Sequence, residues 1–227
     1  MRVPLLLCTD LDRTLIPNGP EPESPGVRER FADLAAHFDV CLAYVSGRDR
    51  DLVLEAIVEY DLPTPDFVIS DVGSTIHRVG PEGEWQRLAA WEGEISKDWG
   101  ACSHADVLDL LLEVPKLQAQ ESAKQGSFKV SFYVPPDADR TSLEQTIRGR
   151  LAGGGVKANL IWSVDDIEGV GLLDILPARA SKYHAVDALM RLHDFKRTST
   201  VFCGDSGNDL EVLASPIPAV LVANARP

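Results

Sequence analysis

Short apolar runs that alternate with amphipathic segments dominate the pattern along the chain. Residues 3–9, 40–45 and 67–70 are almost continuously apolar, as expected for strands of a parallel sheet that helices cover on both faces. Further apolar runs predict strands at 129–134, 159–164, 172–176, 200–203 and 219–222.

Between these runs, apolar residues recur every three or four positions, which is the spacing of a helix with one buried face. The segments with this pattern are 27–38, 51–60 and 182–193. In the first of them, Val27, Phe31, Leu34 and Phe38 are predicted to pack together on the core. The alternation of strands and helices predicts an α/β core.

The middle of the chain has a different pattern. In the run 129–134, Val130, Phe132 and Val134 alternate with polar residues, the two-residue period of a sheet covered on one face. Helical patterns lie at 105–117 and 142–151. We therefore predict a smaller α+β insertion over residues 81–169, within an α/β core of residues 1–80 and 170–227.

Composition and charge narrow the possible partners. The chain has 227 residues, is 44% apolar and 25% charged, and carries a net charge of -13. This acidity argues against nucleic acid and anionic membranes as partners, because both require basic surface. A small anionic substrate is still compatible with it, since a few basic residues in one cleft can dominate the local field.

The cysteines and the N-terminus indicate a cytoplasmic protein. Four cysteines occur without a C-x-x-C pair, and Cys8, Cys41 and Cys203 lie in predicted strands, which favours reduced core thiols. No apolar stretch has the length of a membrane helix, and the N-terminus lacks the features of a signal peptide.

Two carboxylates follow the first predicted strand. Asp10 and Asp12 are two positions apart, so on a strand they would point to the same side, at the sheet edge where α/β folds bind ligands. A hard cation such as Mg²⁺ would make this pairing tolerable. The alternative is an acidic turn in which Asp12 caps the next helix.

A second pair of carboxylates follows the strand predicted at 200–203. Asp205 and Asp209 are four positions apart, and Gly204 before them and Gly207 between them allow a tight turn of the backbone. The start of a helix there could hold both near one point. The alternative is a glycine-rich loop with Asn208 or Asp209 as a helix cap. Two acidic strand ends in one sheet favour a metal site.

Groups suited to an anion occur elsewhere in the chain. Ser46 and Gly47 end the second strand before a helix, where a hydroxyl and free N–H groups can bind an anion. Lys182 begins a predicted helix, where its charge opposes the helix dipole, so a phosphate partner is indicated. The alternatives are a simple N-cap for Ser46 and a solvated lysine.

Other catalytic motifs are absent or incomplete. The sequence has no G-x-x-x-x-G-K-[ST] and no H-E-x-x-H motif. The stretch GDSGN carries Asn208 where a serine-hydrolase elbow requires its second glycine. DLDRTL lacks the glycine of an EF-hand loop, and the histidines show no ligand spacing.

The motifs together resemble the haloacid-dehalogenase (HAD) superfamily of aspartate phosphatases. They are D-x-D-x-T (Asp10, Asp12, Thr14), Ser46–Gly47 after a strand, Lys182, and the stretch GDSGND at 204–209. The stretches YVSGR, DVGSTI, FKVSFYV, LLDILP and SKYHA are similar to those of sucrose-phosphate phosphatases. The resemblance implies a Rossmann-like core with an inserted, mobile α/β cap of the C2 type.

The resemblance also implies a chemistry. Asp10 would be the nucleophile that forms an aspartyl-phosphate, and Asp12 would be the general acid and base. Mg²⁺ would be held by Asp10, the backbone carbonyl of Asp12, and Asp205, with support from Asp209.

Substrate contacts are implied in the same way. Ser46, the Gly47 N–H and Lys182 would bind the transferring phosphoryl group, with Asn208 positioning Lys182 or the phosphate. The residues implied for sugar contacts are Arg48, Ser74 and Lys129. For Lys129, the alternative is an exposed face of an alternating strand.

We therefore expect a cytoplasmic, Mg²⁺-dependent phosphatase that acts on a sugar phosphate, most specifically sucrose 6-phosphate. The alternatives are a related disaccharide or glycosyl phosphate phosphatase (for mannosylfructose phosphate or a glycosyl-phosphoglycerate), a phosphorelay receiver, and a relative that only binds sugar phosphates. Association with a sucrose-phosphate synthase is an expectation from pathway logic. The family also implies a further helical segment, whereas this sequence ends at Arg226 and Pro227.

Overall fold

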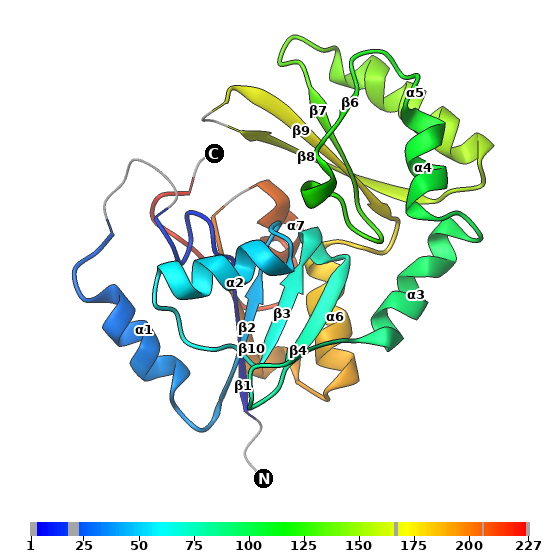
Figure 1. Cartoon of the computed structure of the whole chain (residues 1–227). Coiled ribbons are helices and arrows are strands. Elements are labelled where there is room, and N and C mark those ends of the chain that lie inside the picture. Colours follow the sequence, from blue (N-terminus) through cyan, green and yellow to red (C-terminus); the bar gives the residue numbers. More distant parts are fainter. Residues whose placement is uncertain (1–3, 18–22, 166–167, 206, 226–227) are drawn as a thin grey trace. The chain divides into compact units, whose positions relative to one another are not determined.

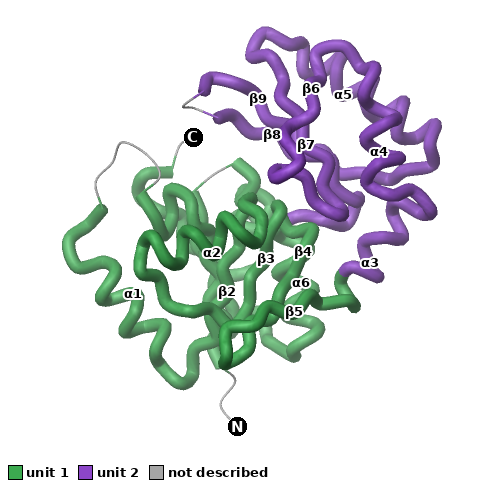
Figure 2. Tube along the Cα trace, viewed as in Figure 1, with its two compact units in different colours: residues 1–91, 182–227 green, residues 92–181 purple. Residues whose placement is uncertain are grey.

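The computed structural model describes residues 4–17, 23–165, 168–205 and 207–225. They form two compact units (Figures 1 and 2). The first unit comprises Met1–Trp91 and Lys182–Pro227, and the second comprises Glu92–Ser181. Val3, at the start of the first predicted strand, and Ser206, in the GDSGND stretch, lie outside the described residues.

A mixed seven-stranded sheet forms the centre of the first unit, in the order β11-β10-β1-β2-β3-β4-β5. The five strands from β11 to β3 are parallel, and β4 and β5 are antiparallel. The strands are β1 (Leu5–Thr9), β2 (Val40–Val45), β3 (Phe67–Ser70), β4 (Thr75–Val79), β5 (Trp85–Arg87), β10 (Thr200–Gly204) and β11 (Ala219–Leu221).

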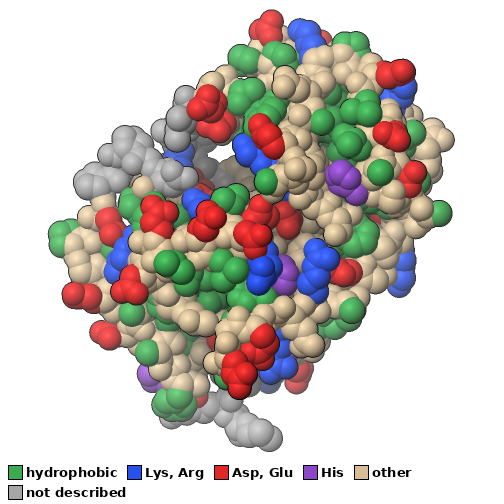
Figure 3. All heavy atoms as spheres, viewed as in Figure 1, with side chains coloured by type: hydrophobic (Ala, Val, Ile, Leu, Met, Phe, Trp, Pro, Cys, Tyr) green, Lys and Arg blue, Asp and Glu red, His purple; other side chains and the backbone are tan. Residues whose placement is uncertain are grey.

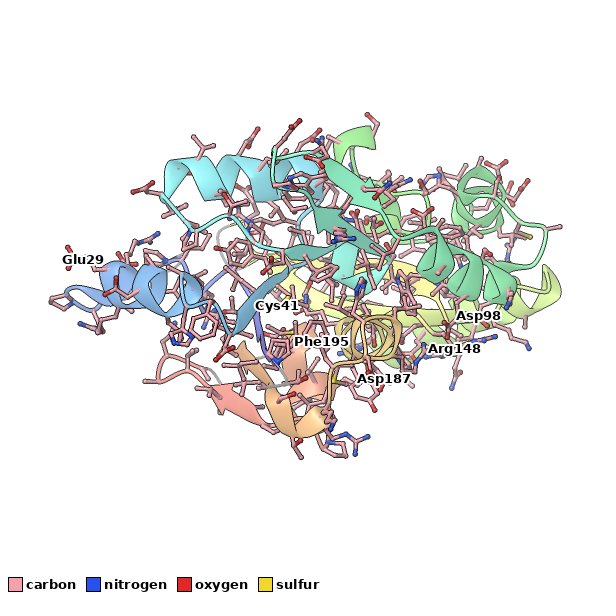
Figure 4. All side chains as sticks on the ribbon, turned by 90° about the horizontal axis from the view of Figure 1, so that it is seen from below. Glu29, Cys41, Asp98, Arg148, Asp187 and Phe195 are labelled. Atoms are coloured by element: carbon pink, nitrogen blue, oxygen red, sulfur yellow. The ribbon has the colours of Figure 1, made fainter. Side chains whose placement is uncertain are left out.

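Helices cover both faces of this sheet, as the apolar strands predicted. They are α1 (Val27–Ala35), α2 (Arg50–Glu59), α6 (Lys182–Leu192) and α7 (Leu210–Leu213), with 3₁₀ turns η1 (Asp71–Gly73), η3 (Arg197–Ser199) and η4 (Gly207–Asp209). Val53 and Ala56 of α2 share a buried cluster with Leu7, Leu42 and Tyr44 of the sheet. In Figure 4, α2 (cyan) and α6 (orange) lie on opposite sides of the strands.

The prediction for the first helix was partly wrong. The helix begins at Val27 as expected, but it ends at Ala35, and none of its residues is fully buried. Phe38 is 84% exposed and Leu34 is 45% exposed. The Val40 N–H donates to the carbonyl of His37, so Phe38 lies on the turn into β2 and not on a packed helix face.

The second unit is an antiparallel sheet in the order β6-β7-β9-β8, with helices on one face. Its elements are α4 (His104–Leu111), β6 (Gln118–Ala119), η2 (Ser122–Lys124), β7 (Val130–Val134), α5 (Arg140–Gly153), β8 (Ala158–Asp165) and β9 (Val170–Pro177), and α3 (Ala89–Trp99) enters it from the first unit. Val130, Phe132 and Val134 pack in one cluster with residues of α4 and α5, as the alternating pattern predicted.

The observed unit boundaries differ from the expected positions 81 and 169. The apolar run predicted at 172–176 forms part of β9, which pairs with both β7 and β8. Leu173 and Ile175 belong to the core of the second unit. This run is apolar because it is a central strand of the smaller sheet, and placing it in the α/β core was therefore wrong.

Surface charge is mixed on the face shown in Figure 3, where Asp and Glu side chains (red) lie beside Lys and Arg side chains (blue). None of the helices in the described part of the chain combines the length and the apolar character needed to cross a membrane.

His77 on β4 makes the stability of the first unit depend on pH. The side chain is 4% exposed, and its ring lies 5.4 Å from that of Trp85. Burial, and then the charges of Arg87 and Arg50, lower the pKa of His77 to about 4. The folded protein therefore keeps this ring neutral where the unfolded chain, with an ordinary pKa near 6.5, takes up a proton.

We expect the contribution of His77 to the free energy of unfolding to fall by up to about 3 kcal/mol as the pH drops from about 7 to 4. In urea unfolding, the free energy of unfolding of His77→Gln relative to the wild type should therefore increase as the pH drops, and His37→Gln, at an exposed position, should behave as the wild type. Equal slopes for His77→Gln and wild type would contradict this prediction.

Candidate active site

Asp10 lies at the carboxyl end of β1. The strand ends at Thr9, and the Asp10 N–H donates to the carbonyl of Cys203 on β10 at 2.9 Å. The side chain is 5% exposed. Beyond it the chain turns, with Arg13 in the left-handed region at φ 60. Asp12 therefore lies in a turn after the strand, and the same-side argument, which holds for residues within a strand, does not apply to it.

Asp205 and Asp209 follow β10 and are both buried. The Asp205 N–H donates to Oδ2 of Asp209 at 3.2 Å. A Cβ on Gly204 would lie 2.6 Å from the same oxygen, so a glycine is needed where the Asp209 carboxylate packs against the strand. Asp209 precedes α7 but makes no side-chain cap bond, which rules out a purely capping role.

Lys182 connects these two strand ends. It is the first residue of α6, and its Nζ donates to Asp10 Oδ1 at 2.9 Å and to Asp209 Oδ1 at 2.7 Å. Lys182 is 1% exposed, so the alternative of a solvated lysine was wrong. Burial alone would lower the pKa of Lys182, but the two carboxylates more than offset it and raise that pKa.

The three buried carboxylates could hold a metal ion. Asp10, Asp205 and Asp209 each offer one oxygen, and these oxygens lie within 4.8 Å of one another. Carboxylate oxygens suit a hard divalent cation. Lys182, and Arg13 near Asp205, offset two of the three negative charges, so a net negative charge remains and the donor set fits a cation.

Burial also affects protonation in this cluster. It raises the pKa of Asp10 to about 7, and Lys182 opposes that shift while Asp209 and Asp12 add to it. A divalent cation on the carboxylates would favour the ionised form, because opposite charge lowers a carboxyl pKa.

The loop after β2 lies next to the GDSGND stretch. Ser46 is fully buried, and its Oγ accepts a hydrogen bond from the Arg48 N–H at 3.1 Å. A Cβ on Gly47 would lie 3.5 Å from Nδ2 of Asn208. The following helix is capped by Asp49, whose side chain accepts from the Leu52 N–H. The alternative that Ser46 is only an N-cap was therefore wrong.

Arg48 forms a two-pronged ion pair with Asp12. Its Nε lies 2.9 Å from Asp12 Oδ2, and its Nη2 lies 2.7 Å from Oδ1. This hydrogen bonding raises the pKa of Arg48. Asp12 thus has a different ion-pair partner from Asp10, which pairs with Lys182. The sequence identified both residues but did not reveal that they are partners.

Ser74 and Lys129 fall in different units. Ser74 follows a strained turn, in which Val72 has φ 58 and donates its N–H to the Ser46 carbonyl. Ser74 is 1% exposed, and its hydroxyl makes no hydrogen bond within the described residues. Lys129 precedes β7 in the second unit and is 5% exposed, so the alternative of an exposed strand residue was wrong.

Arg13 also reaches the acidic cluster, and this was not predicted from the sequence. Its Nε lies 3.4 Å from Oδ2 of Asp205. The signal available in the sequence was an arginine between Asp12 and Thr14, but nothing there indicated that its side chain reaches the second acidic strand end.

Solved structures define the class of the protein. The structure is similar to that of the sucrose-phosphatase from Synechocystis, which was solved with sucrose and phosphate (TM-score 0.81, 28% identity). The match covers the whole of this chain and 85% of the Synechocystis chain. The mixed sheet with helices on both faces is the fold of the HAD-superfamily hydrolases, as the resemblance implied.

The family follows from the sequence comparison. The chain belongs to the sucrose-6F-phosphate phosphohydrolase family, whose sequence profile matches residues 3–227. It is 48% identical over 226 residues, its whole length, to a protein of Nitrosococcus oceani described as a HAD-like hydrolase, and covers 61% of that protein. It is 29% identical to the mannosylfructose-phosphate phosphatase of Agrobacterium fabrum, with 98% of this chain and 84% of that protein covered. The chain spans about half the length of the plant sucrose-phosphatases it matches, 51% for one from Arabidopsis thaliana.

Removal of the Lys182 charge should destabilise the metal-free protein. Lys182→Met leaves Asp10 and Asp209 buried without their shared cation, and breaking such a pair costs roughly 3–5 kcal/mol. We expect that loss in urea unfolding with a chelator present. Lys196→Met, at an exposed position, serves as the control, and an unchanged unfolding midpoint for Lys182→Met would refute the prediction.

Proposed function

We propose that this protein is a Mg²⁺-dependent phosphatase that removes the phosphate from a sugar phosphate, with sucrose 6-phosphate as the preferred substrate. The observation that carries the proposal is the bridging of Asp10 and Asp209 by Lys182, with Asp205 in the same buried cluster. Phosphoryl transfer depends chiefly on positioning and charge neutralisation, and this cluster has the groups for both.

Asp10 is the proposed nucleophile. One of its carboxylate oxygens attacks phosphorus while the bond from phosphorus to the sugar oxygen breaks, and an aspartyl-phosphate forms. Asp12 gives a proton to the departing sugar oxygen. Asp12 pairs with Arg48 whereas Asp10 accepts from Lys182, and this difference in partners supports different roles for the two carboxylates.

The second step restores the enzyme. Asp12, now ionised, takes a proton from a water molecule whose oxygen attacks phosphorus. The bond between phosphorus and Asp10 breaks, inorganic phosphate leaves, and Asp10 is again a carboxylate. Two carboxylates with different surroundings can thus act as nucleophile and as acid and base in one site.

The remaining groups of the first unit orient the phosphoryl oxygens. Ser46, the Gly47 N–H and Lys182 are the proposed donors, with Asn208 positioning Lys182 or the phosphate. A Cβ on Gly47 would lie 3.5 Å from Nδ2 of Asn208, and this contact supports placing Asn208 beside the loop of Ser46 and Gly47.

The proposed ligands of Mg²⁺ are Asp10, the backbone carbonyl of Asp12, and Asp205, with Asp209 as support. When bound, the ion supplies positive charge that offsets the charge on the phosphoryl group and the carboxylates. The buried carboxylate oxygens of the cluster support this assignment.

We propose that the second unit is the cap that selects the sugar, with Lys129 among its contacts and Arg48 and Ser74 contributing from the first unit. A cytoplasmic location and association with a sucrose-phosphate synthase are parts of the same proposal. They are supported only by the reduced cysteines predicted above and by the chemistry of the pathway.

Sucrose 6-phosphate is favoured because of the family and the similarity to a sucrose-phosphatase solved with sucrose and phosphate. A phosphatase for mannosylfructose phosphate is the second candidate, because the Agrobacterium fabrum relative with that name matches nearly the whole chain.

The test is phosphate release with Mg²⁺ from a substrate panel: sucrose 6-phosphate, mannosylfructose phosphate, trehalose 6-phosphate, fructose 6-phosphate and phosphoglycolate. We expect the highest kcat/KM for sucrose 6-phosphate and a loss of at least about a thousandfold in Asp10→Asn, in which the nucleophile is removed. A preference for another sugar phosphate would refute sucrose 6-phosphate as the preferred substrate and leave the proposed mechanism standing. No release from any of them by folded protein would discard the function.

A further inference from the structure

Arg13 brings a second positive charge to the acidic cluster. Its Nε lies 3.4 Å from Oδ2 of Asp205, and the two side chains are 19% and 11% exposed. Asp205 is one of the carboxylates of the candidate metal site. Lys182, the other cation of the cluster, bonds Asp10 and Asp209, so each of the three carboxylates has a protein cation beside it.

The backbone holds Arg13 in an unusual conformation. Its φ of 60 lies in the left-handed region, which glycine and asparagine adopt more readily than arginine. The Arg13 N–H donates to the Ile16 carbonyl at 2.9 Å, and its own carbonyl accepts from Nδ2 of Asn224 at 2.8 Å. Hydrogen bonds thus hold both the N–H and the carbonyl of Arg13, and they fix the turn from which its side chain reaches Asp205.

This arrangement affects the binding of a cation. Mg²⁺ lies about 2 Å from its oxygen ligands, so an ion on Asp205 would share that carboxylate with the guanidinium. The ion and the guanidinium carry like charges only a few ångströms apart and repel each other. Without the ion, the same guanidinium offsets the repulsion between Asp205 and its neighbouring carboxylates.

We propose that Arg13 is a built-in competitor of Mg²⁺ at Asp205: it neutralises that carboxylate in the metal-free protein and weakens binding of the ion. The inference rests on the proposed function, because it assumes the metal site described there. On this proposal, Arg13 raises the Mg²⁺ concentration that is needed to fill the site.

The test is isothermal titration calorimetry of the whole protein with Mg²⁺ alone, without substrate. Arg13→Asn removes the charge and suits the left-handed turn, and we expect it to bind Mg²⁺ at least about tenfold more tightly, because Coulomb repulsion between a divalent and a monovalent ion about 5 Å apart predicts that factor even at the dielectric constant of bulk water. The increase in Tm on adding Mg²⁺ should also be larger in Arg13→Asn than in the wild type.

Two control variants separate the local charge from other effects. Arg13→Lys retains a positive charge and should keep Mg²⁺ affinity within about threefold of the wild type. Arg148→Gln removes one charge from α5 of the second unit (Figure 4), where Arg148 pairs with Glu144, and should leave the affinity unchanged.

The outcomes distinguish the two proposals. Tighter binding in Arg13→Asn alone supports the inference. Equal affinity in Arg13→Asn and wild type, or equal tightening in Arg13→Lys, would overturn the role of Arg13 and leave the metal site standing. Absence of Mg²⁺ binding in both the folded wild type and Arg13→Asn would overturn the metal site, and the inference with it.

Discussion

The ammonium group of Lys182, buried between Asp10 and Asp209, is the interaction on which the rest of the site depends. Buried carboxylates of like charge repel one another, and each costs several kcal/mol to desolvate unless an opposite charge compensates. Lys182 supplies that charge from the start of α6, although a lysine there opposes the helix dipole. Lys182 therefore destabilises the start of α6 slightly, and in return its charge allows the acidic cluster to be buried.

The parallel sheet brings these residues together. Asp10 follows β1, Ser46 follows β2, and Asp205 follows β10, and neighbouring parallel strands end at the same edge of a sheet. Local backbone features then refine the site. Gly204 leaves room for the Asp209 carboxylate, and the strained turn at Val72 donates to the Ser46 carbonyl. Asp12 pairs with Arg48 and Asp10 with Lys182, so two acids at one strand end have different surroundings.

Much of this fold, and the gathering of Asp10, Asp205 and Asp209, was predictable from the sequence, because apolar runs locate the strands and parallel strands end at one edge of the sheet. The strands β2 and β3 and the start of α6 at Lys182 agree with their predicted residues. The exposure of Phe38 was not predictable, because apolar spacing does not show where a helix ends. The run 172–176 was predicted to belong to the wrong sheet, because an apolar run fits a central strand of either one. The pairs Arg48–Asp12 and Arg13–Asp205 depend on side-chain directions in turns, which spacing along the chain does not specify.

The central claim is that Asp10 becomes phosphorylated during turnover, and acid quenching tests it most directly. The substrate is para-nitrophenyl phosphate with a radiolabelled phosphoryl group, because its leaving group needs no proton from Asp12. In Asp12→Asn the second step is slowed, since the water is no longer activated, so label should accumulate on the protein and map to the peptide that contains Asp10. Asp10→Asn should carry no label. Release of nitrophenol by Asp12→Asn without labelled protein, or equal labelling of Asp10→Asn, would contradict the account.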